Sequence, residues 1–304
     1  MNQESSDKSA STGAFPSLRE LCHRHNIRFK KALGQNLLLD DNINAIMVDA
    51  ADLSEEDSVI EVGAGLGALT KRMVPKAGRI LSVEIDSSFM PCLEEQFGAF
   101  PNIRLFRGDI LNHDLDQLVE EYLPGARRLK MVSNLPYYIT TPVLFHFLES
   151  PVYFERLVVM TQMEVGERLT ARVNAENYGS LSIAARLYAE TDIVRRVPAS
   201  CFLPKPKVDS CIVRFRCRRE PLQPGMDLAW TMKVVRAAFQ QRRKTLRNTL
   251  SSAALGLSKE VALRALERAG IDHNRRPQTL DWQEFGLLAD AIRLEKSGAG
   301  PGEG

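Results

Sequence analysis

The chain has 304 residues and a mass of 34.0 kDa, which is enough for one large domain and a small one. Its 44% apolar and 26% charged residues are those of an ordinary globular protein, the net charge is only +2, and no apolar run approaches the roughly 20 residues that a membrane-spanning helix needs. The five cysteines are odd in number and form no C-x-x-C pair, which argues against a zinc knuckle and indicates reduced thiols in a cytoplasmic protein.

Both ends of the chain are predicted to be disordered. Residues 1–15 form a polar leader without the apolar centre of a signal peptide, and residues 295–304 form a flexible, glycine-rich tail. Between the leader and the first strand, apolar residues at helical spacing predict helices over residues 17–26 and 43–53.

The central part of the chain alternates β-branched apolar runs with helical stretches, which is typical of a Rossmann-like, doubly wound α/β sheet. The predicted strands lie within residues 58–74, 78–86, 103–111, 129–139 and 156–162, with further helix and strand pieces in 182–198 and 209–216. Ligands of such sheets bind beyond the carboxyl ends of the strands, and several of the predicted strands end in an acid or an amide.

After Pro224 the pattern becomes helical throughout. The predicted helices lie in residues 228–255, 258–270 and 280–295. We therefore expect a catalytic domain over residues 16–222 and a small helical domain over residues 223–294.

The low net charge hides a strongly basic segment. Residues 195–247 contain 14 Lys and Arg against 3 Asp and Glu, a local net charge of +11, and the rest of the chain carries −9. This asymmetry predicts a polyanionic partner such as RNA, although a solvated helix face would have the same composition. Arg236, Arg243 and Arg247 recur at helical spacing and, with Lys244, are expected to bind RNA from one face of one helix.

A glycine-rich turn after the first predicted strand indicates a nucleotide-like cofactor. Its spacing is G-x-G-x-G, with the third glycine one position early for the dinucleotide fingerprint, and its glycines are Gly63, Gly65 and Gly67. Glu84 ends the second strand and can accept hydrogen bonds from a ribose diol, while Asp109 ends the third and can accept from an adenine amino group. Glu61, before the first of these glycines, can pair with the positively charged ammonium group of an amino acid moiety. Adenine, ribose and an amino acid together describe S-adenosylmethionine.

The stretch SNLPYYIT, residues 133–140, follows the fourth predicted strand. Asn134 and the carbonyl of the Leu135–Pro136 peptide offer two hydrogen-bond acceptors for an exocyclic amino group, and Tyr137 offers a ring that can stack on a base. Such a site can aim the nitrogen lone pair at a methyl group without a strong base. Asn-Leu-Pro is equally compatible with an ordinary turn.

The chain resembles the bacterial ribosomal RNA adenine N6-dimethyltransferases of the small-subunit type, from about Lys30 to Leu288. The segments that carry the resemblance are KALGQNLLLDDNI, VIEVGAGLGALT, VEID, GDIL, NLPYYITTPVLFHFL, MTQMEVGERLTA, YGSLSI, FLPKPKVDS and AFQQRRKTLRNTL. The resemblance implies S-adenosylmethionine contacts at Asn36, Leu38, Gly63, Glu84, Asp109 and Asn134. It also implies that Asn134 to Tyr137 hold the target adenine and that Phe202 closes on its other face.

The family's product is N6,N6-dimethyladenine at two adjacent adenines in a hairpin loop near the 3′ end of 16S ribosomal RNA, within the small subunit or its precursor. The resemblance therefore implies a monomeric enzyme of ribosome biogenesis. A related methyltransferase of 23S ribosomal RNA or of DNA adenine, and a non-catalytic assembly or transcription factor, are the alternatives. Leu37 replaces the phenylalanine usual in the family, which removes a ring that could stack near the cofactor. Phe202 could also be a core residue, and His113 and His146 are interpreted as structural.

Overall fold

The computed structural model describes residues 15–27, 30, 36–220, 222, 225–241, 243–251 and 255–297. Residues 1–14 of the predicted leader, and residues 298–304 of the predicted tail, lie outside these ranges. The boundaries predicted for both ends are shifted. Phe15, counted in the leader, stacks against Phe100 and contacts Phe97, while the last helix continues through residues 295–297.

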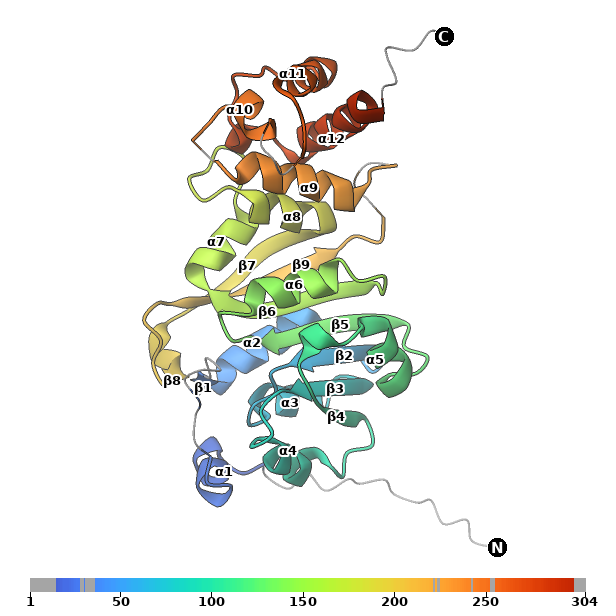
Figure 1. Ribbon diagram of the computed structural model, residues 1–304. Coiled ribbons are helices and arrows are strands. Elements are labelled where there is room, and N and C mark those ends of the chain that lie inside the picture. Colours follow the sequence, from blue (N-terminus) through green and yellow to red (C-terminus); the bar gives the residue numbers. More distant parts are fainter. Residues whose placement is uncertain are drawn as a thin grey trace, which may run out of the picture.

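A seven-stranded sheet forms the centre of the molecule (Figure 1). Its strands are β2 (Asp57–Val62), β3 (Arg79–Glu84), β4 (Ile103–Arg107), β5 (Arg128–Asn134), β6 (Phe154–Gln162), β7 (Ala189–Val197) and β9 (Ser210–Cys217). The strand order is β4-β3-β2-β5-β6-β9-β7. The first five strands in this order pair in parallel, as predicted, whereas β9 runs antiparallel to both of its neighbours.

Helices cover both faces of the sheet, so the central strand β2 is buried throughout, whereas β4 and β7 at the two edges are partly exposed. On one face Val59 of β2 belongs to a core cluster with α2, α3 and α4; on the other face Ile60 belongs to a cluster with α5, α6 and α7. The helices are α2 (Asp41–Ala51), α3 (Ala68–Met73), α4 (Met90–Phe97), α5 (Leu115–Tyr122), α6 (Thr140–Leu148), α7 (Met163–Thr170) and α8 (Ser180–Tyr188). Helices on both faces define the doubly wound α/β class, which confirms the fold class predicted from the sequence.

The chain order reverses between β2 and β5. From β2 the chain proceeds outward to β3 and β4, whereas β5 pairs with the other side of β2 and leads on to β6. A crevice forms at the carboxyl ends of two such strands because their connections leave in opposite directions. Gly63 follows β2 and Asn134 ends β5, so both lie at this crevice.

A short two-stranded sheet lies beside this edge. Strand β1 (Leu37–Leu38) pairs antiparallel with β8 (Phe202–Leu203), with Leu37 opposite Leu203 and Leu38 opposite Phe202. The pairing brings the segment before α2 against the segment between β7 and β9. Helix α1 (Leu18–Arg24), which Ser17 caps, packs against the start of α4 and the glycine turn through Leu21, Leu66 and Phe89.

The C-terminal part is helical, as predicted, but its first helix is broken. Helix α9 (Leu228–Phe239) ends before the polar run at 240–245, and α10 (Leu246–Leu250) begins after it. The remaining helices are α11 (Lys259–Arg268), a 3-10 turn η4 (Pro277–Thr279) and α12 (Trp282–Ser297). The prediction of one continuous helix over residues 228–255 is therefore wrong. The break is fixed by the backbone N–H of Leu246, which donates to the carbonyl of Arg275 (2.8 Å) rather than to a helical partner.

The core of this helical part reaches into the preceding segment. Ile183, Ala184 and Leu187 of α8 are buried in the same cluster as Val234 of α9 and Leu266 of α11. Helix α8 therefore joins the sheet to the C-terminal helices through shared apolar packing.

Candidate active site

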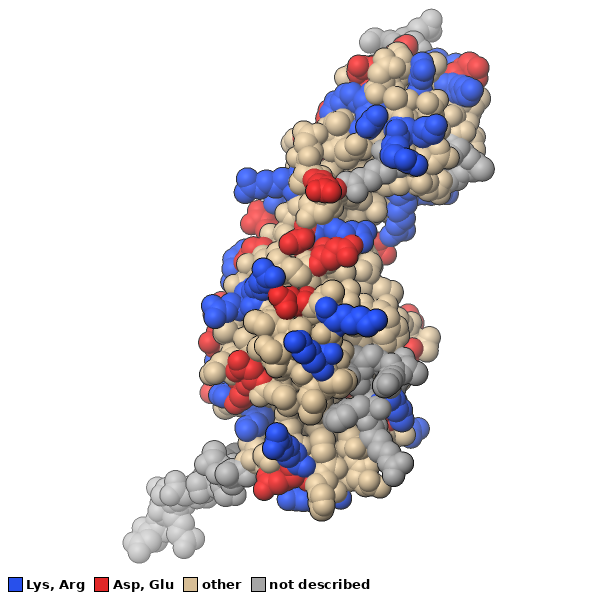
Figure 2. Space-filling model, turned by 90° about the vertical axis from the view of Figure 1, so that its left-hand side faces the viewer, with Lys and Arg blue, Asp and Glu red and all other residues tan. Residues whose placement is uncertain are grey.

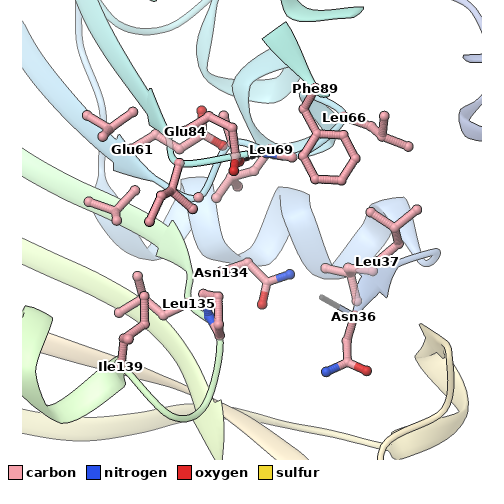
Figure 3. Close-up of a pocket in the computed structure, with 18 of the residues that line it drawn as sticks. Asn36, Leu37, Glu61, Leu66, Leu69, Glu84, Phe89, Asn134, Leu135 and Ile139 are labelled. Carbon is pink, nitrogen blue, oxygen red and sulfur yellow. Dashed lines mark hydrogen bonds between the residues drawn. The ribbon is translucent and has the colours of Figure 1, made fainter. Parts of the chain in front are cut away.

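A pocket opens at the carboxyl ends of β2, β3 and β5, at the crevice where the chain order reverses (Figure 3). Most of the residues predicted for cofactor and target line it: Asn36, Leu38, Glu61, Gly63, Gly65, Glu84, Asp109, Asn134, Leu135, Pro136, Tyr137 and Phe202. These residues come from segments more than 160 positions apart in the chain. One cavity brings together the whole predicted catalytic and cofactor set.

The glycine turn follows β2 and wraps around the cavity. Gly63, Gly65 and Gly67 all have φ between 56° and 78°, the left-handed region in which a side chain would be strained. Gly67 is also tightly enclosed, because an added Cβ would lie 2.3 Å from the ring of Phe97. A Cβ on Gly63 would lie 3.8 Å from Pro136 Cδ and 3.9 Å from the carbonyl oxygen of Asn134. The turn and the Asn-Leu-Pro segment therefore lie close together, with room between them for no more than a small side chain.

Glu84, at the end of β3, is buried and holds this turn in place. The backbone N–H of Gly65 donates to its Oε2 (2.7 Å) and the backbone N–H of Asp86 donates to its Oε1 (2.8 Å). Burial raises the pKa of Glu84, and the two backbone donors oppose that rise. Each carboxylate oxygen keeps a second lone pair, so the group can still accept from a ligand hydroxyl.

Glu61, at the end of β2, is also buried. The hydroxyls of Thr70 and Ser82 both donate to its Oε2, the latter over 3.0 Å. The pKa of Glu61 is raised to about 7: burial is the main cause, the charge of Glu84 adds to the rise, and the hydrogen bonds from Thr70 and Ser82 oppose it. Oε2 of Glu61 is already occupied by these two hydroxyls, so Oε1 is the atom that could pair with a cationic group of a ligand.

Asp109 caps a 3-10 turn, η2 (Ile110–Asn112), at the edge of the pocket. Its Oδ1 accepts from the backbone N–H of Leu111 (3.1 Å), which fixes the carboxylate beside the end of β4. Asn36 and Leu38 reach the pocket from the β1 segment on the opposite side. The cofactor residues predicted from the sequence thus lie on three sides of one cavity.

Asn134 projects into the middle of the cavity, with Glu61 and Glu84 to one side and Asn36 and Leu37 to another (Figure 3). Its backbone is fixed, because Asn134 pairs with Met160 in the β5–β6 ladder. Within the described part of the chain its side-chain amide makes no hydrogen bond. A polar group held by its backbone and left without a protein partner is suited to bind a ligand.

The segment after Asn134 is held by a hydrogen bond that the sequence did not reveal. Leu135 is buried beneath the pocket, and Tyr137 is half-buried with its hydroxyl 2.7 Å from the hydroxyl of Ser210. Ser210 is fully buried at the start of β9. Ser210 lies in FLPKPKVDS, one of the segments that carry the family resemblance, but the sequence alone assigned no role to this serine. The Ser210 hydroxyl fixes the ring of Tyr137 at the pocket wall.

Phe202 lines the pocket and is also a core residue. Its side chain is only 3% exposed and belongs to the cluster that contains Leu38 and Val197. The interpretation of Phe202 as a core residue is therefore confirmed, and its role against the target adenine stays a prediction that its place in the pocket lining allows. Leu37, the departure from the usual phenylalanine, lines the pocket and packs against the cluster that joins α1 to the glycine turn.

The basic residues predicted on one helix face lie in two places. Arg236 is on α9, forms an ion pair with Glu149 (3.2 Å) and lines a second cavity behind the sheet. Arg243 and Lys244 are exposed in the turn before α10, and Arg247 is exposed on α10 itself. The grouping on one helix face is wrong because the helix ends at Phe239. Lysine and arginine side chains gather on the C-terminal part of the face in Figure 2, over the helical region.

The two histidines interpreted as structural make contacts within the fold. His146 contacts the carbonyl of His113 (3.0 Å), and His113 packs edge-on against Phe106, in agreement with the structural roles predicted. The five cysteines are free. In the described ranges no cluster of three His, Cys, Asp or Glu could hold a metal, and none of the helices is long and apolar enough to cross a membrane.

The doubly wound sheet, the glycine turn and the acids at the ends of the adjacent strands define a Rossmann-like methyltransferase. The family description of ribosomal RNA adenine dimethylases matches residues 26–289, and the chain belongs to this family. It is 42% identical over 274 residues to the ribosomal RNA small subunit methyltransferase A of Clostridium perfringens strain SM101, covering 90% of this chain and 94% of the relative. A relative of the same name from Shouchella clausii is 41% identical over 88% of this chain and 91% of its own length.

Two solved structures are similar over most of their length. The dimethyladenosine transferase of Plasmodium falciparum has a TM-score of 0.71 at 25% identity, over 86% of this chain and 98% of its own. The 23S rRNA methyltransferase ErmE has a TM-score of 0.63 at 26% identity, over 84% and 99%.

Proposed function

We propose that the protein transfers methyl groups from S-adenosylmethionine to the N6 nitrogens of two adjacent adenines in a hairpin loop near the 3′ end of 16S ribosomal RNA. It acts in the cytoplasm as a monomer on the small ribosomal subunit or its precursor. The observation that carries the proposal is the position of Asn134, whose side-chain amide projects into the pocket next to the glycine turn and has no hydrogen-bond partner among the described residues. Family membership and the names of the relatives support the substrate.

The residues of the cavity fit S-adenosylmethionine by the chemistry of its parts. Glu84 is the acceptor for the ribose diol, Asp109 for the adenine amino group, and Glu61 Oε1 for the ammonium group. Asn36, Leu38 and Gly63 also line the cavity and would contact the rest of S-adenosylmethionine. Because Gly63 has no side chain, its backbone allows a close approach of the ligand. When bound, this cofactor supplies an electrophilic methyl group.

Asn134 prepares the target nitrogen for the transfer. The exocyclic nitrogen of adenine is a weak nucleophile because its lone pair is delocalised into the ring. Hydrogen bonds from the amino group to the Asn134 side-chain oxygen and to the Leu135 carbonyl draw the nitrogen towards tetrahedral geometry and aim its lone pair into the pocket. After the transfer the nitrogen loses a proton to solvent, so no strong base is required.

The base is held by aromatic and apolar surfaces. The Tyr137 ring, fixed through Ser210, stacks on one face of the adenine, and Phe202 lies against the other. Such a slot accepts an adenine only after it has left its helix, which favours a target in a loop.

The helical C-terminal part, residues 223–294, is the second RNA-binding region, and residues 16–222 form the catalytic region. Arg243, Lys244 and Arg247 present their charges beside the loop at residues 273–276, because the backbone N–H of Arg247 donates to the carbonyl of His273 (3.3 Å). Exposed cations of this kind contact phosphates. Arg236 retains a lesser role, since Glu149 already neutralises it.

The substrate assignment is tested by mass spectrometry of ribosomal RNA from a strain that lacks this gene. We expect the dimethyladenines near the 3′ end of 16S ribosomal RNA to be absent and to return when the gene is restored, but not when the Asn134→Ala variant is supplied. Intact 16S modification together with a lost adenine methylation in 23S ribosomal RNA or DNA would instead identify the alternative substrate.

A further inference from the structure

Exposed apolar side chains lie on the segments that line the pocket. Seven large hydrophobic side chains are exposed among the described residues, and five of them are 47% to 56% exposed and belong to these segments or directly follow them: Leu39, Ile85, Tyr138, Leu203 and Val208. The other two, Leu287 and Leu294, are on α12 in the C-terminal part. We call the five residues the apolar rim. Contiguous exposed apolar surface usually marks a binding surface.

The placement of the rim follows from the elements around the pocket. Ile85 and Tyr138 line the cavity directly, after β3 and after the Asn-Leu-Pro segment. Leu203 pairs with the pocket residue Leu37 across the β1–β8 sheet, and the backbone N–H of Leu39 donates to the carbonyl of Cys201 (2.8 Å). Val208 is two residues before Ser210, the partner of Tyr137.

Positive charge accompanies the rim on one side. Lys205 and Lys207 lie between Leu203 and Val208, and both are exposed. Neither is within ion-pair distance of an acid among the described residues, although the charge of Lys205 helps to lower the pKa of Asp209. A ligand that matches this surface has flat apolar groups for the rim and closely spaced negative charges for the two lysines. Single-stranded RNA has this combination, with a base and a phosphate in every nucleotide.

We propose that the apolar rim binds the unstacked bases of the nucleotides that flank the target adenine, while Lys205 and Lys207 contact their phosphates. This inference rests on the proposed function and extends it. The pocket interior recognises the amino group of the target, and the rim recognises the open conformation of its neighbours. A paired or stacked neighbour cannot offer its face to Leu203 or Tyr138, so the rim selects loops over duplexes.

The test compares two double variants that remove equally exposed leucine or valine side chains. Leu203→Ser with Val208→Ser alters the rim, and Leu287→Ser with Leu294→Ser is the matched control on α12. Binding is measured with a hairpin whose loop carries two adjacent adenines, with 2-aminopurine beside them as a reporter of unstacking. We expect the rim variant to bind roughly tenfold more weakly, as for the removal of one stacked base, and to show no fluorescence rise. The control should match the wild type, and S-adenosylhomocysteine affinity should be unchanged in both.

A second measurement needs no variant. The wild-type protein is compared on the same hairpin with abasic nucleotides on either side of the adenines, and we expect a similar loss of affinity.

The two lysines are tested by a further double variant. Lys205→Gln with Lys207→Gln should lower the salt dependence of binding, by about 0.7 in slope for each phosphate that the variant no longer neutralises. Equal binding of rim and control variants, or undiminished binding to the abasic hairpin, would overturn the proposal. These experiments measure RNA binding and not methylation. Failure of the proposed function is recognised separately, because the wild-type protein would then transfer no methyl group to the RNA.

Discussion

Two buried carboxyl groups, Glu61 and Glu84, lie in the part of the pocket proposed to hold the cofactor, and both accept hydrogen bonds. Each accepts hydrogen bonds from the protein: Glu61 from two hydroxyls, Glu84 from two backbone N–H groups. Burial disfavours the charged form of a carboxyl group, and these hydrogen bonds oppose that effect. The arrangement holds the glycine turn in shape before a cofactor arrives.

Glu84→Ala should weaken S-adenosylmethionine binding by about 1.5–3 kcal/mol for each charge-assisted hydrogen bond that it removes. The glycine turn also loses its anchor at Gly65, so the effect should exceed that of one hydrogen bond. Isothermal titration calorimetry measures it, and Glu84→Gln, which can still accept from the Gly65 N–H, should bind better than the alanine variant. Unchanged affinity in Glu84→Ala would count against the cofactor assignment.

Stability should depend on pH through Glu61. Its pKa is about 7 in the folded protein and ordinarily 4.5, so the folded state retains a proton that the unfolded chain loses between these values. The stabilisation from the neutral carboxyl is fully present below about pH 4.5 and is lost as pH rises through 7. Urea unfolding at pH 5 and pH 7.5 should show a smaller fall in unfolding free energy for Glu61→Gln than for the wild type. A fall of equal size in both would show that Glu61 does not carry this dependence.

Tyr137→Phe should separate the hydroxyl of this residue from its ring. The hydroxyl bonds to the buried Ser210, so its removal should cost about 0.5–1.5 kcal/mol of stability while the stacking ring remains. Methyl transfer should be nearly normal in Tyr137→Phe, whereas Tyr137→Ala should lose about 1–3 kcal/mol of base stacking. Denaturant unfolding and single-turnover rates provide the two readouts. A phenylalanine variant as slow as the alanine variant would contradict the stacking role.

At the scale of the elements, the sequence predicted the sheet and the pocket well because both rest on local patterns. The β-branched runs, the glycine turn after β2 and the polar strand ends are each read from fewer than twenty residues. The break between α9 and α10 was missed because its cause is distant: Leu246 bonds to Arg275, about thirty positions later. The Tyr137–Ser210 bond and the partners of Glu61 were missed for the same reason, since tertiary contacts between side chains leave no periodic signal.

The turn before α10 and α10 itself should bind RNA mainly by charge. Replacing Arg243 and Arg247 together with glutamine should weaken binding and lower its salt dependence by about 0.7–0.9 in slope for each phosphate that is no longer neutralised. The matched control is Arg264→Gln with Arg268→Gln on α11, where both arginines already pair with Glu295. Cofactor affinity should be normal in both variants. If the two double variants have the same salt slope as the wild type, the exposed arginines before and on α10 are only solvated.

At the scale of the whole molecule, the proposed catalytic pocket and the proposed RNA-binding residues lie towards one side. The β1–β8 sheet beside the pocket and α10 lie on the same side in Figure 1, and Figure 2 views the molecule from that side. Helix α8 links them through a core that continues from the sheet into the C-terminal helices. Under the proposed function, one RNA would contact the basic residues near α10 while one of its adenines enters the pocket.

The central claim is that the Asn134 amide orients the target nitrogen for methyl transfer. The most direct measurement is the single-turnover rate of Asn134→Ala on small subunits that lack the modification, with cofactor affinity measured in parallel. Removal of one preorganised polar group typically slows the chemical step about 10²–10³-fold, and we expect a decrease of that size with RNA affinity and fold retained. A near-normal rate in this variant would contradict the account, and the Asn-Leu-Pro-Tyr segment would then be an ordinary turn at the edge of the pocket.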